Sequence, residues 1–196
     1  MVHATMKAAV AALLLAATVV LSEARTTKLG VLRDVGECPT VTTKQDFDML
    51  SYLGSWFEIE RFDALFEEGM DCVQIVYSDL GDGVFQTHNL ARTVEGELTE
   101  ILGTVIVLEP GVLLVESDSG VPFLHYILDT DYESFAALYN CKQFGEQRYQ
   151  YAWITSRATT LDEATHDHVR KVFQDNGIDV SLFQFTYQGP DCPHTP

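Results

Sequence analysis

Residues 72–117 read CVQIVYSDLGDGVFQTHNLARTVEGELTEILGTVIVLEPGVLLVES, in which β-branched and aromatic runs alternate with glycine-containing turns. The turns Gly81-Asp82-Gly83, Glu95-Gly96 and Pro110-Gly111 allow the positive φ that tight hairpins require. The pattern therefore predicts four consecutive antiparallel strands, at Cys72 to Ser78, Val84 to Thr93, Gly96 to Leu108 and Val112 to Ser117.

The same pattern continues on both sides of this stretch. One further strand is predicted before it and three after it, at Ser55 to Arg61, Phe123 to Asp129, Phe135 to Gln143 and Arg148 to Ser156. Ser119-Gly120 and Gly145 supply two more turns. Eight successive antiparallel strands are the number that closes into a small up-and-down barrel. The expected fold is therefore all-β, an eight-stranded antiparallel up-and-down β-barrel over about residues 54–157.

One helix is expected after the barrel, over about residues 161–176. Thr160 and Glu163 fit a capping box at its start, and Asn176-Gly177 supplies a left-handed stop. Apolar residues recur at helical spacing, at Leu161, Ala164, Val169, Val172 and Phe173. This single apolar stripe predicts an α-helix packed against the outside of the barrel. A C-terminal segment, 178–196, follows it.

The N-terminus has the features of a signal peptide. Lys7 precedes an apolar run from Ala8 to Leu21, and Ser22-Glu23-Ala24 offers the small residues of a cleavage site. Residues 1–24 are interpreted as this signal and residues 25–196 as a single secreted domain. The run is shorter than the roughly 20 residues of a membrane span, and no second such run follows. Stable membrane insertion is therefore not expected.

The net charge and the cysteines limit which partners and metal ions the chain is expected to bind. A net charge of −17 opposes binding to nucleic acid. Four cysteines in an oxidising compartment predict two disulfides, although spacing leaves three pairings open: Cys38, Cys72, Cys141 and Cys192. These cysteines lie far apart, whereas zinc ligands come in closely spaced pairs, so no metal site is expected.

Alternation along the strands predicts which side chains face the barrel interior. The inward sets are large and apolar with isolated polar groups, a composition typical of a small-molecule pocket. They are Val73, Ile75 and Tyr77 on the second strand, Phe85, Thr87 and Asn89 on the third, and Tyr151, Trp153 and Thr155 on the eighth. The alternative is that the inward aromatic residues simply fill the core.

Three separated segments together resemble the lipocalin family. They are Gly54-Ser55-Trp56 after a segment, Asp48 to Leu53, that resembles the family's short helical turn, then the turn Thr130-Asp131-Tyr132, and Arg157 at the end of Trp153-Ile154-Thr155-Ser156-Arg157. The resemblance implies that Trp56 plugs the closed end of the barrel, with the Arg157 guanidinium stacked on its indole. Both residues, and the turn at Thr130, Asp131 and Tyr132, would then be structural and not catalytic.

Within that family the sequence most resembles the apolipoprotein D group and its arthropod bilin-binding and crustacyanin-type relatives. The resemblance lies in Trp56 to Arg61, Leu138 to Cys141, Tyr151 to Ile154 and Asp191-Cys192-Pro193. It implies disulfides from Cys38 to Cys141 and from Cys72 to Cys192. It also places Tyr77, Asn89 and Trp153 in a ligand cavity. Tyr139 and Gln143 are added to this set, although alternation leaves their orientation open, as it does for Tyr126 and His125.

The expected function is extracellular binding and transport of a small hydrophobic ligand, such as a fatty acid, sterol, retinoid, carotenoid or bilin. No other cofactor is expected. The loop 62–70, with Phe66 and Met70, is expected to form a gate at the open mouth. An alternative is an oligomeric protein that sequesters a pigment; the sequence does not determine oligomeric state or receptor.

An enzyme is the third, less favoured possibility. A cysteine-dependent lipocalin isomerase needs a free thiol, and all four cysteines are expected in disulfides. His166 and His168 are two apart on the predicted helix, so they point to different faces and are expected to be solvated. No nucleophile, base and orienting acid occur at a recognisable spacing, and we expect no catalytic residues.

Overall fold

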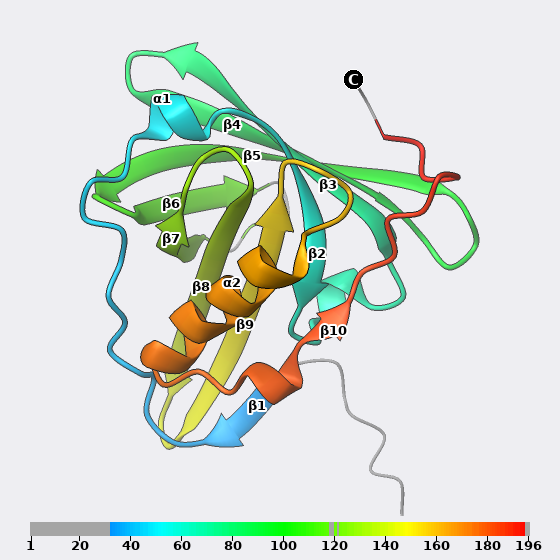
Figure 1. Ribbon diagram of the computed structural model, residues 1–196. Coiled ribbons are helices and arrows are strands. Elements are labelled where there is room, and N and C mark those ends of the chain that lie inside the picture. Colours follow the sequence, from blue (N-terminus) through cyan, green and yellow to red (C-terminus); the bar gives the residue numbers. More distant parts are fainter. Residues whose placement is uncertain (1–31, 118–119, 121, 195–196) are drawn as a thin grey trace, which may run out of the picture.

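The computed structural model describes residues 32–117, 120 and 122–194, and its main body is a closed sheet with one long helix on its outer side (Figure 1). The predicted signal peptide lies outside the described residues. The strands are β1 Leu32–Val35, β2 Gly54–Arg61, β3 Asp71–Gly81, β4 Val84–Arg92, β5 Leu98–Glu109, β6 Val112–Ser117, β7 Phe123–Thr130, β8 Phe135–Phe144, β9 Gln147–Ser156 and β10 Gln184–Phe185.

Strands β2 to β9 form the barrel. Each pairs antiparallel with the next in the chain, and β9 also pairs with β2, which closes the sheet. The predicted eight-stranded up-and-down barrel is therefore confirmed. Two short strands extend the sheet: β1 pairs with β9, and β10 pairs with β2. Sequence patterning missed them because four and two residues show no readable alternation.

Short turns join β3 to β4, β4 to β5, β5 to β6 and β8 to β9, as predicted. The turn glycines all have positive φ: Gly81, Gly83, Gly96, Gly111, Gly120 and Gly145. Gly111 is also needed for space, because a Cβ there would lie 2.9 Å from the Ile127 carbonyl oxygen. A side chain at this position would push β7 away from the β5–β6 turn.

The principal helix, α2, covers Glu163–Asp175 and lies across the outer face of β7 and β8 (Figure 1). The predicted cap at Thr160 is wrong. Asp162 is the N-cap, and its carboxylate accepts the Thr165 backbone N–H at 3.0 Å. Asp162 and Thr160 are both good caps, so the start is ambiguous in the sequence. The predicted stop is confirmed, with Asn176 at the C-cap and Gly177 at φ +73°.

Three shorter helical segments complete the fold. They are α1 Met49–Tyr52, just before β2, and two 3-10 turns, η1 Leu65–Glu67 and η2 Val180–Leu182. The first confirms the helical turn expected before Trp56. The second lies in the loop 62–70.

Two apolar clusters pack on opposite faces of the barrel wall. The inner cluster includes Trp56, Tyr77, Phe85, Leu138 and Trp153. The outer cluster joins the wall to α2, with the buried residues Ile59, Phe62, Leu128, Phe135, Ala137, Tyr139, Ala152, Ile154, Val169, Phe173 and Ile178. Val169 and Phe173 are thus buried as predicted, whereas Ala164 is exposed and Leu161 precedes the helix. Strict alternation along β8 and β9 separates the two clusters.

A β-bulge in β2 changes this alternation. Glu58 pairs with Thr155 while Glu60 pairs with Ile154, so Ile59 is an extra residue in the strand. Glu58 lines the barrel interior, but Glu60 faces outward and binds Arg170 of α2 at 2.6 Å. Two glutamates of the same parity therefore face opposite sides of the wall.

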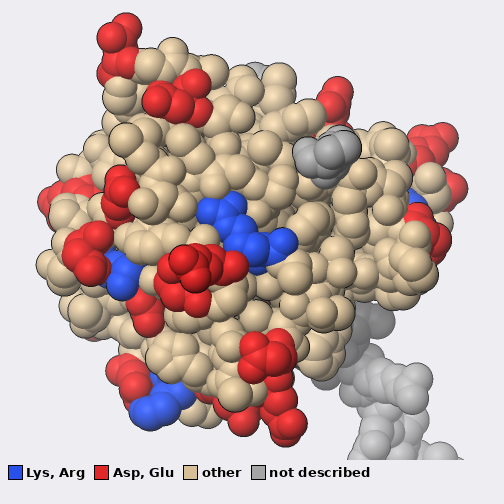
Figure 2. All heavy atoms as spheres, turned by 45° about the horizontal axis from the view of Figure 1, so that its top comes forward, with Lys and Arg blue, Asp and Glu red and all other residues tan. Residues whose placement is uncertain are grey.

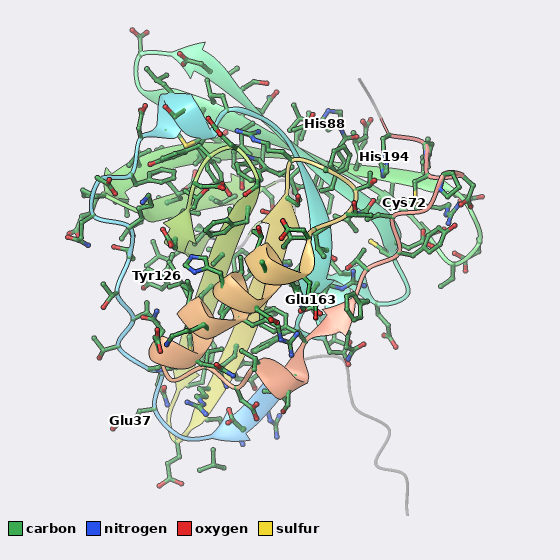
Figure 3. All side chains as sticks on the ribbon, in the orientation of Figure 1. Glu37, Cys72, His88, Tyr126, Glu163 and His194 are labelled. Atoms are coloured by element: carbon green, nitrogen blue, oxygen red, sulfur yellow. A yellow bond between two sulfur atoms is a disulfide. The ribbon has the colours of Figure 1, made fainter. Side chains whose placement is uncertain are left out.

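Both expected disulfides are present: Cys38–Cys141 and Cys72–Cys192. The first ties the segment before α1 to β8. The second ties the C-terminal segment to the start of β3, and Figure 3 shows Cys72 beside that segment.

Acidic side chains are spread over the face shown in Figure 2, and basic side chains lie close to acidic ones. The ion pairs Arg92–Asp71, Arg148–Asp34 and Lys171–Asp175 are of this kind. With a net charge of −17 over the chain, such a surface is unfavourable for a polyanion.

Candidate functional site

The closed end of the barrel is built around Trp56. Its indole is fully buried, donates from Nε1 to the Tyr52 carbonyl at 2.9 Å and stacks on the Tyr52 ring. The Arg157 guanidinium carbon lies 3.8 Å from the centroid of the Trp56 ring. The arrangement expected for these two residues is therefore present.

Arg157 also connects the segments that meet at this end. Its Nη1 donates to the Ser55 carbonyl at 2.8 Å, its Nε to the Tyr132 carbonyl at 3.0 Å, and its Nη2 to two carbonyls of α1. Gly54 lies directly beneath, where a Cβ would come within 3.3 Å of Nη1. The guanidinium thus joins α1, β2, the β7–β8 turn and the end of β9.

The turn Thr130-Asp131-Tyr132 is held by its own side chains. Asp131 Oδ1 accepts the backbone N–H groups of Glu133, Ser134 and Phe135 at 2.8 to 3.0 Å. Thr130 donates to the Phe135 carbonyl at 2.6 Å. Tyr132 adopts φ +69°, and its hydroxyl accepts the Asp48 backbone N–H. These contacts give the turn a structural role at the closed end.

Above this floor the barrel contains a cavity of about 370 Å³. The wall is mainly apolar and aromatic, with a few polar groups. The lining residues are Tyr52, Trp56, Glu58, Phe66, Glu67, Met70, Val73, Ile75, Tyr77, Asn89, Leu90, Ala91, Thr99, Glu100, Ile101, Val115, Ser117, Phe123, His125, Leu138, Trp153 and Thr155.

Most residues predicted to face inward do so. Val73, Ile75, Tyr77, Asn89 and Trp153 line the cavity. Phe85 also points inward but is buried in the inner apolar cluster rather than at the cavity wall. The three strand faces therefore follow the predicted alternation.

Tyr139 and Gln143 lie elsewhere, so the expected inward orientation is wrong for both. Tyr139 is in the outer cluster, and its hydroxyl donates to Gln150 at 2.7 Å. Gln143 is exposed, and its side chain bonds Cys38 N and Gly36 O. The register explains this result, because inward Trp153 pairs with Leu138 and not with Tyr139. Tyr126 also packs on the α2 side of the sheet (Figure 3).

Several polar residues of the cavity were not identified by sequence alternation, among them Glu58, Glu67 and His125. Glu58 has the parity of Trp56 and could have been found by extending that face. His125 was ambiguous, and its ring stacks on Trp153 with centroids 5.3 Å apart. Glu67 comes from the mouth loop, where its Oε2 accepts the Trp153 indole N–H at 3.2 Å. No strand pattern predicts where a loop side chain points.

Burial changes the protonation of two of these groups. It raises the pKa of Glu67 to about 8, and the neighbouring Glu58 carboxylate adds to this shift, opposed by Arg61. Burial also lowers the pKa of His125 to about 4. At neutral pH the cavity therefore presents a protonated Glu67 and a neutral imidazole.

Phe66 and Met70 lie at the cavity, as expected for the loop 62–70. Phe66 is partly exposed, with its ring 5.6 Å from that of Tyr151 and 6.3 Å from that of Phe123. Arg61 of β2 holds this loop in place, because its Nη2 donates to the carbonyl oxygens of Glu67 and Met70.

Of the two helix histidines, His168 is exposed as predicted but His166 is not. His166 is partly buried, with Nε2 3.1 Å from Glu60 Oε1. The outward turn of Glu60 at the bulge creates this contact, which lies on the side of the wall away from the cavity. All four cysteines are disulfide-bonded.

Within the described part of the chain, no helix is long and apolar enough to cross a bilayer. The same residues contain no group of three or more His, Cys, Asp or Glu side chains placed to hold a metal ion.

Comparisons with known proteins agree with this architecture. The family model described as a Lipocalin-like domain matches residues 47–188. Apolipoprotein D of Mus musculus is 33% identical over 173 residues, covering 86% of this chain and 90% of its own. Insecticyanin-A of Manduca sexta is 29% identical over 161 residues, covering 76% of this chain and 84% of its own.

Solved structures show the same fold. Lobster apocrustacyanin A1 superposes with a TM-score of 0.76 at 22% identity, over 85% of this chain and 96% of that one. Insecticyanin of the tobacco hornworm Manduca sexta gives 0.74 at 23% identity, over 83% and 92%. The closed barrel, the Trp56–Arg157 floor and the match over residues 47–188 together show that this chain belongs to the lipocalin family.

Proposed function

We propose that this protein binds a small hydrophobic molecule in its barrel and carries it outside the cell. The observation that supports this most is the cavity of about 370 Å³, lined by Trp153, Tyr77, Ile75 and other apolar side chains above a sealed floor. Small-molecule sites have volumes of about 300 to 1,000 Å³ and a mainly apolar wall with few polar groups.

The extracellular setting is supported by two features. Residues 1–24 have the pattern of a signal peptide, and the two disulfides are typical of an oxidising compartment. Two of the similar proteins are named as an apolipoprotein and an apocrustacyanin, names that fit a role in carrying a ligand. The ligand-contacting residues that we propose are Val73, Ile75, Tyr77, Asn89 and Trp153.

Phe66 and Met70 are proposed to cover the mouth. The Phe66 ring contacts two aromatic rings, makes no hydrogen bond and is partly exposed. It can therefore rotate away from the mouth at little cost. A ligand would enter past this side chain.

The test is a fluorescence titration with the uncharged lipophiles retinol and cholesterol. We expect retinol to quench the Trp153 emission, since its polyene would lie against the indole. The variant Ala91→Phe, which adds a ring inside the cavity, should weaken retinol binding about tenfold or more, or about 1.4 kcal/mol, because the ring occupies space that the ligand needs.

The matched control is Ala164→Phe, the same substitution at an exposed position of α2. It should bind retinol as the unmodified protein does. Folded protein that binds neither lipophile, or Ala91→Phe protein with unchanged affinity, would contradict a ligand site inside the barrel.

A further inference from the structure

The charged groups at the cavity are acidic. Among the described residues that line it, Glu58, Glu67 and Glu100 carry carboxyl groups and His125 carries an imidazole, and none is Lys or Arg. The described lining therefore offers hydrogen-bonding groups but no cation. Lys142 lies beside the lining residue Phe123, where its Nζ is 4.3 Å from the ring and donates to the Pro122 carbonyl at 3.2 Å.

Arg61 is the guanidinium that contacts Glu58 and Glu67, and four of its five N–H donors are already used. Nη1 binds Glu58 Oε1 at 2.5 Å and Thr186 Oγ1 at 3.1 Å. Nη2 binds the carbonyl oxygens of Glu67 and Met70 at 2.8 and 3.0 Å. Its Nε lies 3.7 Å from Glu67 Oε2. Arg61 thus neutralises Glu58 and holds the mouth loop, and four of its five N–H groups are unavailable to a ligand anion, while the fifth, at Nε, lies beside the Glu67 carboxyl group.

Glu67 is held inside the mouth by Trp153 of β9. It faces Glu58 and Arg61 of β2, and the other titratable groups of the wall are His125 of β7, Glu100 of β5 and the phenol groups of Tyr52 and Tyr77. At neutral pH its carboxyl group retains a proton, for the reasons given above. A ligand hydroxyl can donate to this group and accept from it. A ligand carboxylate would instead add a second negative charge to a site whose one guanidinium, Arg61, is already paired with Glu58.

His125 is a second uncharged polar group of the lining. Its Nδ1 is buried and has no hydrogen-bond partner among the described residues. A neutral imidazole nitrogen can bind a hydroxyl as donor or acceptor, depending on the tautomer. It supplies no positive charge to an anion.

We propose that the cavity selects lipophiles whose polar end is an uncharged hydroxyl group and excludes free carboxylates with the same hydrocarbon tail. This selectivity rests on the proposed carrier function and specifies its ligand class. Of the ligand types considered from the sequence, it favours sterols and retinol-type alcohols over fatty-acid anions.

The experiment compares retinol with retinoic acid, which share a polyene and differ in the polar end. Affinities are measured by tryptophan quenching on the full secreted protein at pH 7.5. We expect retinol to bind about tenfold tighter or more. Retinoic acid enters as a carboxylate, and each unit by which the cavity raises the pKa of that carboxylate weakens its binding tenfold. Equal affinities, or tighter binding of the acid, would overturn the selectivity while leaving the carrier function supported.

A second measurement tests the part played by Glu67. Raising the pH from 7 to 9 ionises this group, so retinoic acid should weaken further while retinol changes little. Glu67→Gln should remove that pH dependence, and Glu68→Gln, at the exposed neighbouring position, should retain it. A pH dependence that persists in Glu67→Gln would contradict this role. Failure of both retinoids to bind folded protein would instead reject the carrier function, and the selectivity with it.

Discussion

Single side chains at the floor hold this barrel together. Arg157 covers the Trp56 indole and donates to backbone carbonyls of α1, β2 and the β7–β8 turn. A guanidinium suits this position because it is planar and directs several N–H groups at once, whereas an ammonium group is a compact point charge. The contribution of Arg157 is therefore geometric as well as electrostatic.

The variant Arg157→Lys is expected to lower the free energy of unfolding by about 3 kcal/mol, since hydrogen bonds from a charged donor contribute about 1.5 to 3 kcal/mol each and several are lost or weakened. Urea denaturation followed by circular dichroism measures this change. Arg33→Lys, at an exposed position of β1, serves as the control and should change little. A loss below about 0.5 kcal/mol in Arg157→Lys would show that charge alone suffices at this site.

At the scale of elements, the two faces of the barrel wall have different roles: one encloses the cavity and the other supports helix α2. The inner face encloses the cavity, and the outer face supports α2 through Val169 and Phe173, both fully buried. The bulge at Ile59 adds a polar attachment by turning Glu60 toward Arg170. Helix α2 therefore stabilises the sheet without contributing a side chain to the cavity lining.

Truncation of Phe173, which packs α2 against the barrel, should lower the stability of the protein without changing its affinity for a ligand. Phe173→Ala is expected to cost about 3 to 5 kcal/mol, the usual range for a buried phenylalanine. The fraction that remains folded should bind retinol with unchanged affinity, because α2 lies on the far side of the wall. Thermal unfolding and quenching titrations measure the two effects, with Gln174→Ala at the exposed neighbouring position as the control. A folded Phe173→Ala protein with weakened binding would show coupling through the wall.

Over the whole molecule, the disulfides fix the two end segments to the barrel. Cys38–Cys141 closes a sequence separation of 103 residues and Cys72–Cys192 one of 120. The entropy of loop closure depends only on the logarithm of loop length, so the two bonds restrict the unfolded chain to nearly the same extent.

Two double variants test this expectation: Cys38→Ser with Cys141→Ser, and Cys72→Ser with Cys192→Ser. Each should lower the free energy of unfolding by about 4 kcal/mol, and the two should agree within about 1 kcal/mol. Urea denaturation of both proteins side by side gives the comparison. If either double variant is as stable as the unmodified protein, the bond it lacks does not restrict the unfolded chain as proposed.

Local patterns in the sequence determined much of this protein. Alternation and turn glycines identify strands β2 to β9, because a hairpin records its geometry in adjacent residues. The combination of Trp56, Thr130-Asp131-Tyr132 and Arg157 indicated the family, and the resemblance to the apolipoprotein D group implied the disulfide pairing. Alternation within β3 and β4 was enough to turn Tyr77 and Asn89 inward.

Only the tertiary structure decided where that alternation is interrupted and what the loops add. The orientation of Tyr139 depends on the register between β8 and β9, and the outward turn of Glu60 on a one-residue bulge. The meeting of Glu58, Arg61 and Glu67 depends on a loop folding back over the barrel. Register, bulges and loop paths arise from contacts between distant parts of the chain, so no local pattern of residues encodes them.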